Sequence, residues 1–250
     1  MTLYPLDAVR NAAIDRTLEP ILEEIRTEVA ASSHDVGTPD EVLEAFDYAR
    51  PRLNVLASLL AGASGPGADI SSGLAFLPIL LRRRGHAIVA TERDPTLARL
   101  AAAAGIEIRE YDIGRTPPPF EPASQDYVVL SEVLEHLPFA PQGVLAEVGS
   151  LVRPGGRLLL TTPNIARAAN METLATGESF HEPVPDLPLG APFPDRLEHI
   201  REYSIRETVD AVEGAGLGVR RVLMTGWGDR GYAPLPNPYA NEIIVVEAER

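Results

Sequence analysis

Residues Gly67–Arg93, GADISSGLAFLPILLRRRGHAIVATER, are the stretch that decides the fold of this chain. A short apolar segment leads into the small-residue turn Ser71–Gly73, and the apolar run Leu74–Arg84 follows it. A second apolar segment, His86–Thr91, ends at the acid Glu92. This order predicts a strand, a tight turn, a helix and a second strand. Such a unit can hold a nucleoside, because small residues let a ligand approach the backbone near a helix N-terminus, and the acid accepts from the ribose hydroxyls.

The composition is typical of a soluble globular protein. The chain has 250 residues, of which 45% are hydrophobic and 23% are charged, so we expect one large domain or one domain with a cap. No apolar run approaches the roughly 18 residues of a membrane span, and the N-terminus lacks the pattern of a signal peptide. These features predict a cytoplasmic protein with no membrane partner. Cysteine is absent, which excludes disulfides, thiolate metal sites and a cysteine nucleophile.

The charged residues exclude further classes. All 22 basic residues are arginine, so Schiff-base chemistry, a lysine base and a Walker-type phosphate loop are excluded. The formal net charge of −14 makes nucleic acid an unlikely partner, because binding to a phosphate backbone needs clustered cations. The dense run Arg82–Arg84 lies at a predicted helix C-terminus, where cations suit the helix dipole.

The N-terminal part, residues 1–60, is predicted to be helical. Apolar residues recur with a helical period over Ile14–Ala30, and a second helix begins at Thr38 and is interrupted by Pro51. Residues 1–52 are therefore predicted to form a helical cap on the main domain, 53–250. This cap either covers the edge of a sheet or forms a lid over the ligand.

From Ala68 onward, short apolar strands alternate with helices. The expected strands are Ala68–Ser71, His86–Glu92, Ile106–Asp112, Tyr127–Leu130, Arg157–Thr162, Val219–Thr225 and Glu242–Glu247. The expected helices are Leu74–Arg84, Pro95–Ala104, Val144–Val152 and Ile205–Gly214. Repeated strand–helix units predict a parallel sheet with helices on both faces. The last two strands have no predicted helix between them, which indicates an antiparallel pair at the C-terminus.

This pattern resembles the class I S-adenosylmethionine-dependent methyltransferases. Their turn is usually D-x-G-x-G-x-G, and Asp69–Ala75 is D-I-S-S-G-L-A, which keeps Gly73. The segment Leu151–Leu160, LVRPGGRLLL, is similar to the family's turn before the fifth strand. The resemblance implies a Rossmann-like α/β fold, with a mostly parallel sheet that ends in an antiparallel hairpin, and S-adenosyl-L-methionine as the cofactor.

The resemblance also implies which residues contact the cofactor. Its amino-acid end would meet the turn, its ribose would meet the acid after the second strand, and its adenine would meet the residues after the third strand. The residues at these places are Asp69, Ser71, Ser72, Gly73, Glu92, Arg93, Asp112, Ile113 and Ser131. For Asp112 an ordinary surface acid is the alternative.

The segment Asp126–Pro138, DYVVLSEVLEHLP, carries the candidate chemistry. A buried strand is followed by Glu132, Glu135 and His136; if the chain turns helical after the strand, these three side chains share one face. Two carboxylates and an imidazole can hold a divalent cation such as Mg²⁺. The pattern resembles the metal site of small-RNA terminal 2′-O-methyltransferases, in which a later histidine completes the set. Here His199 takes that place.

Three interpretations of this segment stay open. A cation held by Glu132, Glu135, His136 and His199 activates a hydroxyl; or His136 acts as a base without metal; or the residues are structural. His181 is a spare candidate ligand. In the first two interpretations the catalytic residues are His136, Glu132 and His199.

The predicted function is O-methylation of a hydroxylated small molecule or saccharide, assisted by a divalent cation. The alternatives are an N-methyltransferase, an RNA 2′-O-methyltransferase, and a non-catalytic binding protein of the same fold. The proline-rich segment 164–197 is predicted to be an insertion on the substrate side. The loop Gly226–Ala240, which carries Trp227, Tyr232 and Tyr239, is a second candidate wall of the acceptor site.

Overall fold

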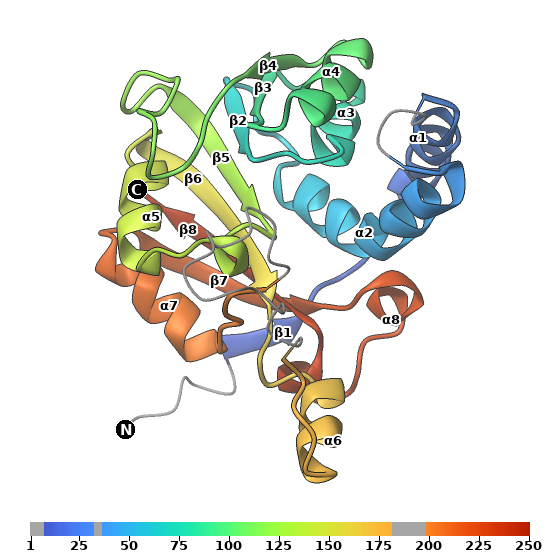
Figure 1. Cartoon of the computed structure of the whole chain (residues 1–250). Coiled ribbons are helices and arrows are strands. Elements are labelled where there is room, and N and C mark those ends of the chain that lie inside the picture. Colours follow the sequence, from blue (N-terminus) through green and yellow to red (C-terminus); the bar gives the residue numbers. More distant parts are fainter. Residues whose placement is uncertain (1–7, 33–36, 182–198) are drawn as a thin grey trace, which may run out of the picture.

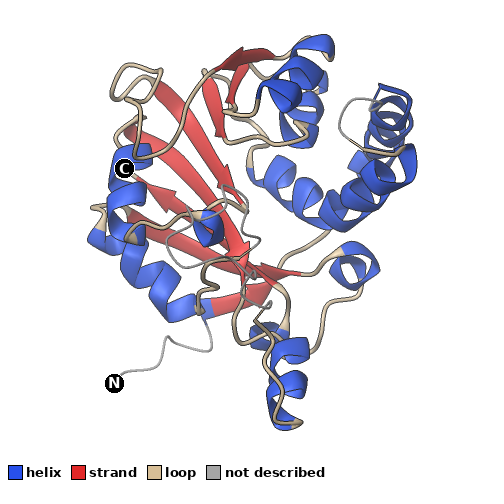
Figure 2. Cartoon of the chain, in the orientation of Figure 1, coloured by secondary structure: helices blue, strands red, loops and turns tan. Residues whose placement is uncertain are grey.

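The structure, a computed structural model, describes residues 8–32, 37–181 and 199–250, and within them a single sheet has helices on both faces (Figures 1 and 2). The strands are β1 (Val9–Asn11), β2 (Gly67–Ile70), β3 (Ile88–Thr91), β4 (Glu107–Arg109), β5 (Gln125–Ser131), β6 (Val152–Pro163), β7 (Gly218–Thr225) and β8 (Ile243–Glu249). The α-helices are α1 (Glu19–Ser32), α2 (Pro39–Leu59), α3 (Phe76–Arg83), α4 (Pro95–Ala103), α5 (Pro141–Gly149), α6 (Ala168–Ala175), α7 (Ile205–Gly214) and α8 (Gly228–Tyr232). Short 3₁₀ turns span Arg16–Leu18, Leu134–His136 and Pro238–Ala240.

The eight strands follow the order β1-β7-β8-β6-β5-β2-β3-β4. Strand β8 is antiparallel to both of its neighbours, β6 and β7, whereas the other strand pairs are parallel. The predicted fold class, a mostly parallel sheet with an antiparallel hairpin at its C-terminal end, is therefore confirmed. The reversal at β8 follows from its connection to β7, because the short helix α8 between them does not carry the chain back across the sheet.

Two hydrophobic cores lie on opposite faces of the sheet, and alternate residues of each strand supply them. In β5, Val128 and Leu130 pack with residues of α5 and α7. Tyr127 and Val129 point to the other face, where they pack with residues of α1, α2, α3 and α4. Helices α1 and α2 lie on this second face beside α3 (Figure 1). The N-terminal helices thus share a core with the sheet.

The prediction that residues 1–60 are entirely helical is wrong at Val9–Asn11. These residues form β1, which pairs in parallel with β7 through Val9 and Val222. A strand of three residues is too short to show a hydrophobic period. Its pairing partner lies at the other end of the chain, so only the tertiary structure reveals it.

The predicted interruption at Pro51 is also wrong, because α2 continues through it. A proline inside a helix removes one backbone hydrogen bond and crowds the preceding turn. Here burial offsets this cost: Pro51 is buried, and a Cβ on Gly231 of α8 would lie only 2.1 Å from the Pro51 Cβ. The predicted boundary between the cap and the main domain at residue 52 falls inside this continuous helix. A lid function for the cap stays a prediction.

Gly67 of β2 leaves no room for a side chain beside Tyr127, a residue of the second core. A Cβ at this residue would lie 2.0 Å from the ring of Tyr127, which is fully buried. We predict that Gly67→Ala lowers the free energy of unfolding by about 1–3 kcal/mol, the cost of overpacking a core. Gly143 on α5 is the matched control, since a Cβ there meets nothing within 4 Å. Gly143→Ala should raise the free energy of unfolding by about 0.5–1 kcal/mol through helix propensity. Urea unfolding of both variants checks this, and equal shifts would contradict it.

Candidate functional site

The predicted site residues follow the carboxyl ends of adjacent strands. Strand β2 lies between β3 and β5, and all three run in parallel. The turn at Ser71–Gly73, the acid Glu92 and the segment that begins at Glu132 therefore emerge at the same edge of the sheet. Open α/β sheets bind their ligands at this edge.

The turn after β2 has an unusual backbone. Ser71, Gly73 and Ala75 have φ angles of 58°, 55° and 57°, a region that costs a non-glycine residue free energy. The N–H of Ser71 donates to Thr91 Oγ1 at 3.0 Å, and the N–H of Ser72 donates to the Thr91 carbonyl at 2.9 Å. The buried Ser72 Oγ has no hydrogen-bond partner among the described residues. A strained turn with an unsatisfied hydroxyl is a suitable place for a ligand to approach.

The acid Glu92 is joined directly to this turn. Its Oε2 accepts from the N–H of Gly73 at 2.9 Å, and its Oε1 accepts from the N–H groups of Arg93 at 2.8 Å and Asp94 at 3.0 Å. Three backbone donors therefore fix a carboxylate that is 7% exposed. The structure brings the predicted turn and the predicted ribose acid to one place.

A further charged group, Arg52 of α2, reaches the same edge. Its Nη1 lies 3.2 Å from Glu132 Oε2, and its charge acts on Asp69 at the end of β2. The buried Nε of Arg52 has no hydrogen-bond partner in the part of the chain that the structure describes. Sequence reasoning missed this residue, because it belongs to a helix predicted to break at Pro51 and no motif marks it.

Asp69 itself is 3% exposed. Burial raises the pKa of Asp69 from 3.8 to about 8; the charge of Arg52 opposes this rise and that of Glu92 adds to it. A buried carboxyl without a direct ion pair favours its neutral form. Asp69 is therefore placed to sense the charge of whatever occupies this edge.

This pKa predicts a specific pH dependence of stability. The folded chain keeps a proton on Asp69 that the unfolded chain releases above 3.8, so the stabilisation is complete below that value and is lost as the pH rises through about 8. The difference is on the order of 5 kcal/mol. We expect the unfolding free energy of the parent, relative to Asp69→Asn, to fall over this range in urea unfolding without added cofactor. Parallel pH profiles for the two proteins would contradict the prediction.

At the predicted adenine end, Asp112 interacts with two arginines. Its Oδ2 lies 3.9 Å from Arg93 Nη1 and 3.7 Å from Arg115 Nη1. The neighbouring Ile113 is 3% exposed. The ring of Phe139 covers Gly114, since a Cβ there would lie 2.9 Å from it. Asp112 is thus linked to Arg93, the residue after Glu92, and the adenine contact of Asp112 and Ile113 stays a prediction.

The chain does not turn into an α-helix directly after β5. Glu132 has a φ of 55° and lies outside any helix, and only Leu134–His136 adopts a 3₁₀ turn. The condition under which Glu132, Glu135 and His136 would share one helix face is therefore not met. Ser131 and Glu132 both bond to Thr161 of β6, at 2.9 and 2.8 Å. The pairing of β5 with β6 and the charge of Arg52 thus direct Glu132, and a local helical period does not.

Three of the four predicted ligands do meet. Carboxylate and imidazole atoms of Glu135, His136 and His199 lie within 4.8 Å of one another, and Glu132 is not among them. The His136 and His199 ring centroids are 5.1 Å apart. The backbone carbonyl of Glu135 accepts from the N–H groups of Ile200 and Arg201 at 2.8 and 3.2 Å, which draws the segment carrying His199 against the 3₁₀ turn.

The carboxyl group of Glu135 is fully buried. Its Oε2 accepts from Thr162 at 3.1 Å, whereas its Oε1 lies 3.9 Å from His136 Nε2 and has no hydrogen-bond partner within the described ranges. Burial raises the pKa of Glu135 well above its usual value, the charge of Glu132 adds to this, and the Thr162 hydrogen bond opposes it. An unsatisfied buried oxygen beside two imidazoles suits a cation or a proton donor.

The histidine at 199 is held by a second acid. Its Nδ1 lies 3.0 Å from Glu202 Oε1. Burial alone would raise the pKa of Glu202, but hydrogen bonds from His199, Arg167 and Asn170 hold it at about 2. Glu202 is therefore an ionised carboxylate inside the protein.

The outer parts of the predicted site are described only in part. Residues 182–197 of the predicted insertion lie outside the described residues, and α6 lies in its first part. His181 is exposed and stacks on Phe180 at 4.3 Å, apart from the Glu135 cluster. In the second candidate wall, the guanidinium of Arg167 lies over the ring of Trp227 at 5.2 Å. Tyr232 instead turns to α1 and donates to Glu19 at 2.9 Å.

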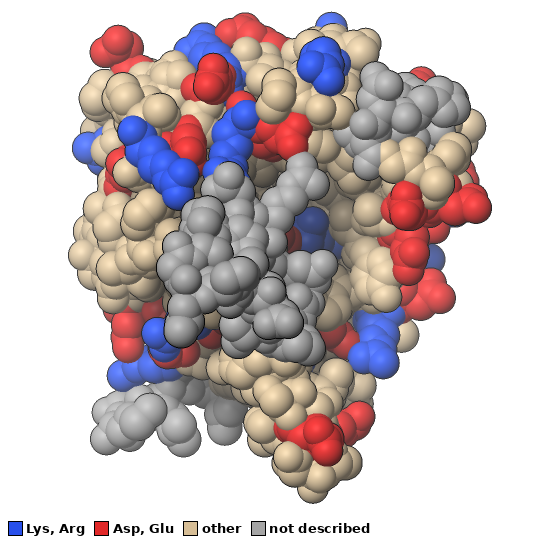
Figure 3. Space-filling model, viewed as in Figure 1, with Lys and Arg blue, Asp and Glu red and all other residues tan. Residues whose placement is uncertain are grey.

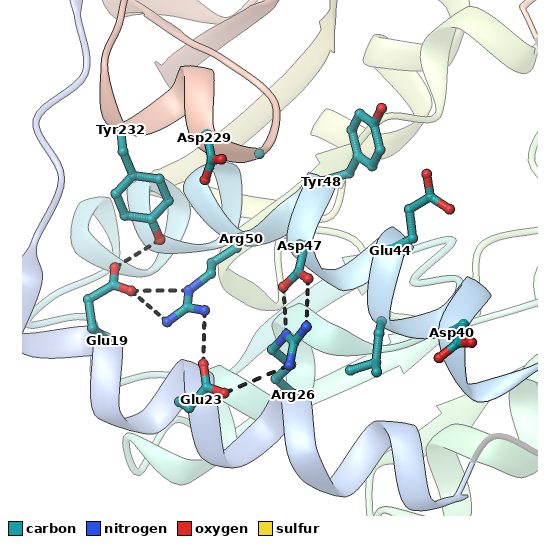
Figure 4. Close-up of a pocket in the computed structure, with 12 residues that line it drawn as sticks. Glu19, Glu23, Arg26, Asp40, Glu44, Asp47, Tyr48, Arg50, Asp229 and Tyr232 are labelled. Atoms are coloured by element: carbon teal, nitrogen blue, oxygen red, sulfur yellow. Dashed lines mark hydrogen bonds and ion pairs between the residues drawn. The ribbon is translucent and has the colours of Figure 1, made fainter.

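Tyr232 lines an open hollow of about 900 Å³ between α1, α2 and α8 (Figure 4). A series of ion pairs crosses it: Arg50 joins Glu19 to Glu23, and Arg26 joins Glu23 to Asp47. None of the predicted cofactor or metal residues lines this hollow. These ion pairs tie α1 to α2, and the hydrogen bond from Tyr232 to Glu19 ties α8 to α1.

Figure 3 shows how the charged side chains are distributed over one face of the molecule. On the described atoms of the face in Figure 3, arginines and acids are interspersed and form no continuous basic surface. In the described ranges no helix combines the length and the apolar character needed to cross a membrane.

Comparisons with known proteins point in one direction. A family model described as a methyltransferase domain matches residues 42–222. The ubiquinone biosynthesis O-methyltransferase of Aeromonas salmonicida is 30% identical over 181 residues, which cover 68% of each chain. A relative of the same name in Xanthomonas euvesicatoria is 28% identical over 141 residues, or 54% of this chain and 57% of that protein. The two alignments thus cover 68% and 57% of the lengths of these relatives.

Solved structures share the fold. An S-adenosylmethionine-dependent methyltransferase from Mesorhizobium loti has a TM-score of 0.56 at 16% identity, covering 81% of this chain and 98% of that one. A second, from Archaeoglobus fulgidus, has a TM-score of 0.56 at 11% identity, with 81% and 97% covered.

Proposed function

Because this chain belongs to the class I S-adenosylmethionine-dependent methyltransferases, we propose that it methylates an oxygen of a hydroxylated small molecule or saccharide. One observation carries the proposal. Two groups of residues lie at one edge of the sheet, after strands that are neighbours. One is the hydrogen-bonded pair Gly73 and Glu92, and the other is the cluster of Glu135, His136 and His199. A cofactor site and a group that handles protons can therefore face the same acceptor.

The residues at the turn would hold the cofactor. Glu92 would accept from the ribose hydroxyls, Asp112 and Ile113 would meet the adenine, and the turn with Arg52 would receive the amino-acid end. Arg52 suits a carboxylate because a guanidinium presents several donors in one plane, and its Nε has no partner among the described residues. The cofactor supplies an activated methyl group when bound, so this chain has to orient the acceptor and remove its proton.

The Glu135 cluster would serve the acceptor. An imidazole within reach of a hydroxyl can take its proton, and the relatives that carry the name ubiquinone biosynthesis O-methyltransferase support oxygen as the acceptor atom. An N-methyltransferase remains the near alternative with the same cofactor site. An RNA acceptor is disfavoured by the net charge of −14.

The same cluster fits a divalent cation. Two imidazoles and one carboxylate, whose buried Oε1 has no hydrogen-bond partner among the described residues, are suitable donors, and Glu135, His136 and His199 would hold the ion. This donor set favours a transition metal over Mg²⁺, which prefers oxygen ligands, since Glu132 is paired with Arg52. A bound cation would lower the pKa of a coordinated hydroxyl. Without it, one of the two histidines would act as the base.

The test has two stages. Calorimetry with S-adenosylmethionine should show saturable binding; no binding at millimolar cofactor would overturn the enzyme and favour the non-catalytic alternative. A panel of matched hydroxyl and amine acceptors, followed by mass spectrometry, should then give methylated oxygen. Methylated amine alone would replace the O-methyltransferase by its N-methylating alternative. Turnover after dialysis against a chelator tests whether a divalent cation is required. Unchanged turnover would show that it is not.

A further inference from the structure

We propose that Glu202 is a positioning residue for His199. It accepts a hydrogen bond from Nδ1–H of His199, so that Nε2 of the same ring is available to the cluster of Glu135, His136 and His199. The proposal rests on the role of His199 in the proposed function. It adds a residue that no sequence motif indicated, together with the two residues that hold it in place.

Both carboxylate oxygens of Glu202 have hydrogen-bond partners. It is 4% exposed, its Oε1 lies 3.0 Å from His199 Nδ1, and its Oε2 accepts from Asn170 Nδ2 at 2.9 Å and from Arg167 Nη1. Asn170 belongs to α6, and Arg167 is the residue just before this helix. Donors from another segment therefore keep the second oxygen occupied and leave the first to His199.

The partners of Glu202 are themselves anchored. The guanidinium of Arg167 lies over the ring of Trp227 at 5.2 Å. The backbone next to Glu202 is fixed as well, because Ile165 N–H donates to the carbonyl of Tyr203 at 3.0 Å. The position of Glu202 is thus set by α6 and by the loop before α8. A segment held from two sides can define the orientation of a ring on it.

The chemistry of the pair decides the tautomer of His199. Arg167 and Asn170 both donate to Glu202 Oε2, and Arg167 forms an ion pair with it, so Glu202 Oε1 is the acceptor that faces His199. The Nδ1 of His199 then carries the proton and Nε2 carries the lone pair. That lone pair is what a cation requires of a ligand and what a general base requires to take a proton. The same arrangement therefore serves the site with or without metal.

The experiment measures the tautomer directly. Long-range ¹⁵N–¹H spectra of the cofactor-free protein, recorded at about pH 9, well above the usual histidine pKa of about 6.5, should show His199 protonated at Nδ1. Glu202→Leu should shift it toward the Nε2–H form or a mixture. Glu202→Gln should also shift it toward the Nε2–H form, because the amide oxygen must accept from Arg167 and Asn170, which leaves the amide N–H group facing His199 Nδ1. The signal is assigned with His199→Ala.

Matched controls separate positioning from general damage. Arg167→Gln should disturb the His199 signals, whereas Arg201→Gln, an exposed arginine next to Glu202 that pairs with Glu207, should leave them unchanged. Glu213→Gln on α7, also exposed, controls for the change of charge. Near-ultraviolet circular dichroism reports whether each variant keeps its packing. If Glu202→Leu does not fold, the Gln variant carries the test.

Binding and kinetics give independent readouts. Titration with Zn²⁺ or Mn²⁺ should show affinity reduced by about 10–100-fold in Glu202→Leu if a cation binds, and kcat should fall by a similar factor with cofactor affinity unchanged. An unaltered His199 tautomer in the Leu and Gln variants would overturn the proposal. A shifted tautomer combined with full turnover in His199→Ala would leave the positioning intact and overturn the proposed role of His199, so the two failures are distinguishable.

Discussion

Replacing His199 by alanine is expected to lower kcat by about a hundred- to ten-thousandfold, the usual range for losing a group that handles a proton. The reason is geometric: His199 lies in the cluster with Glu135 and His136, at the sheet edge where the acceptor would meet the methyl group. The hydrogen bond between Gly73 and Glu92 joins the residues that follow β2 and β3, whereas the cluster begins after β5. Calorimetry should therefore give unchanged cofactor affinity. Single-turnover methyl transfer measures the loss.

A second histidine is the matched control. His181 is exposed and stacks on Phe180 outside the cluster, and His181→Ala should keep full turnover. Equal losses in the two variants would contradict the assignment of His199. Imidazole added to His199→Ala separates a role as a base from a role as a cation ligand. If His199 is a base, imidazole from solution should restore turnover. If it is a ligand, the variant should also bind the metal more weakly.

Replacing Arg52 by glutamine is expected to weaken binding of S-adenosylmethionine by about 10–100-fold, as for losing a charge-assisted hydrogen bond worth about 1.5–3 kcal/mol. Arg52 is the arginine of α2 whose Nη1 lies 3.2 Å from Glu132 and whose charge acts on Asp69. Its removal leaves the partly buried Glu132 without its ion-pair partner and removes the positive charge that acts on the buried Asp69, which also disfavours the turn. Calorimetry measures the affinity.

Arg50 is the control for Arg52, because it lies on the same helix but pairs with Glu19 and Glu23 in the hollow of Figure 4. Arg50→Gln should leave cofactor affinity unchanged. If Arg52→Gln binds the cofactor as tightly as the parent, α2 has no part in the cofactor site and serves only to cover the sheet.

The sequence predicted the architecture because the features that define it are local. Alternating apolar strands and helical runs set the order of the elements, and Ser71–Gly73 with Glu92 marked the turn and the acid that the structure joins through one hydrogen bond. The same local reasoning failed at Glu132, where pairing of β5 with β6 overrides the expected helix. It failed again at Pro51, where burial against Gly231 keeps α2 continuous.

The sequence by itself thus determined the fold class, the course of the chain and the strand ends that carry the polar residues, since periodicity and turn composition act over a few residues. Only the tertiary structure decided which side chains meet there. It brought Arg52 to the sheet edge that carries the turn, left Glu132 outside the cluster of Glu135, His136 and His199, and placed Glu202 beside His199. Glu202 and His199 are close in the sequence, but Arg167 and Asn170, which hold Glu202, belong to another segment, as Arg52 does relative to Glu132. Contacts between distant segments depend on the packing of the whole chain, which no local pattern predicts.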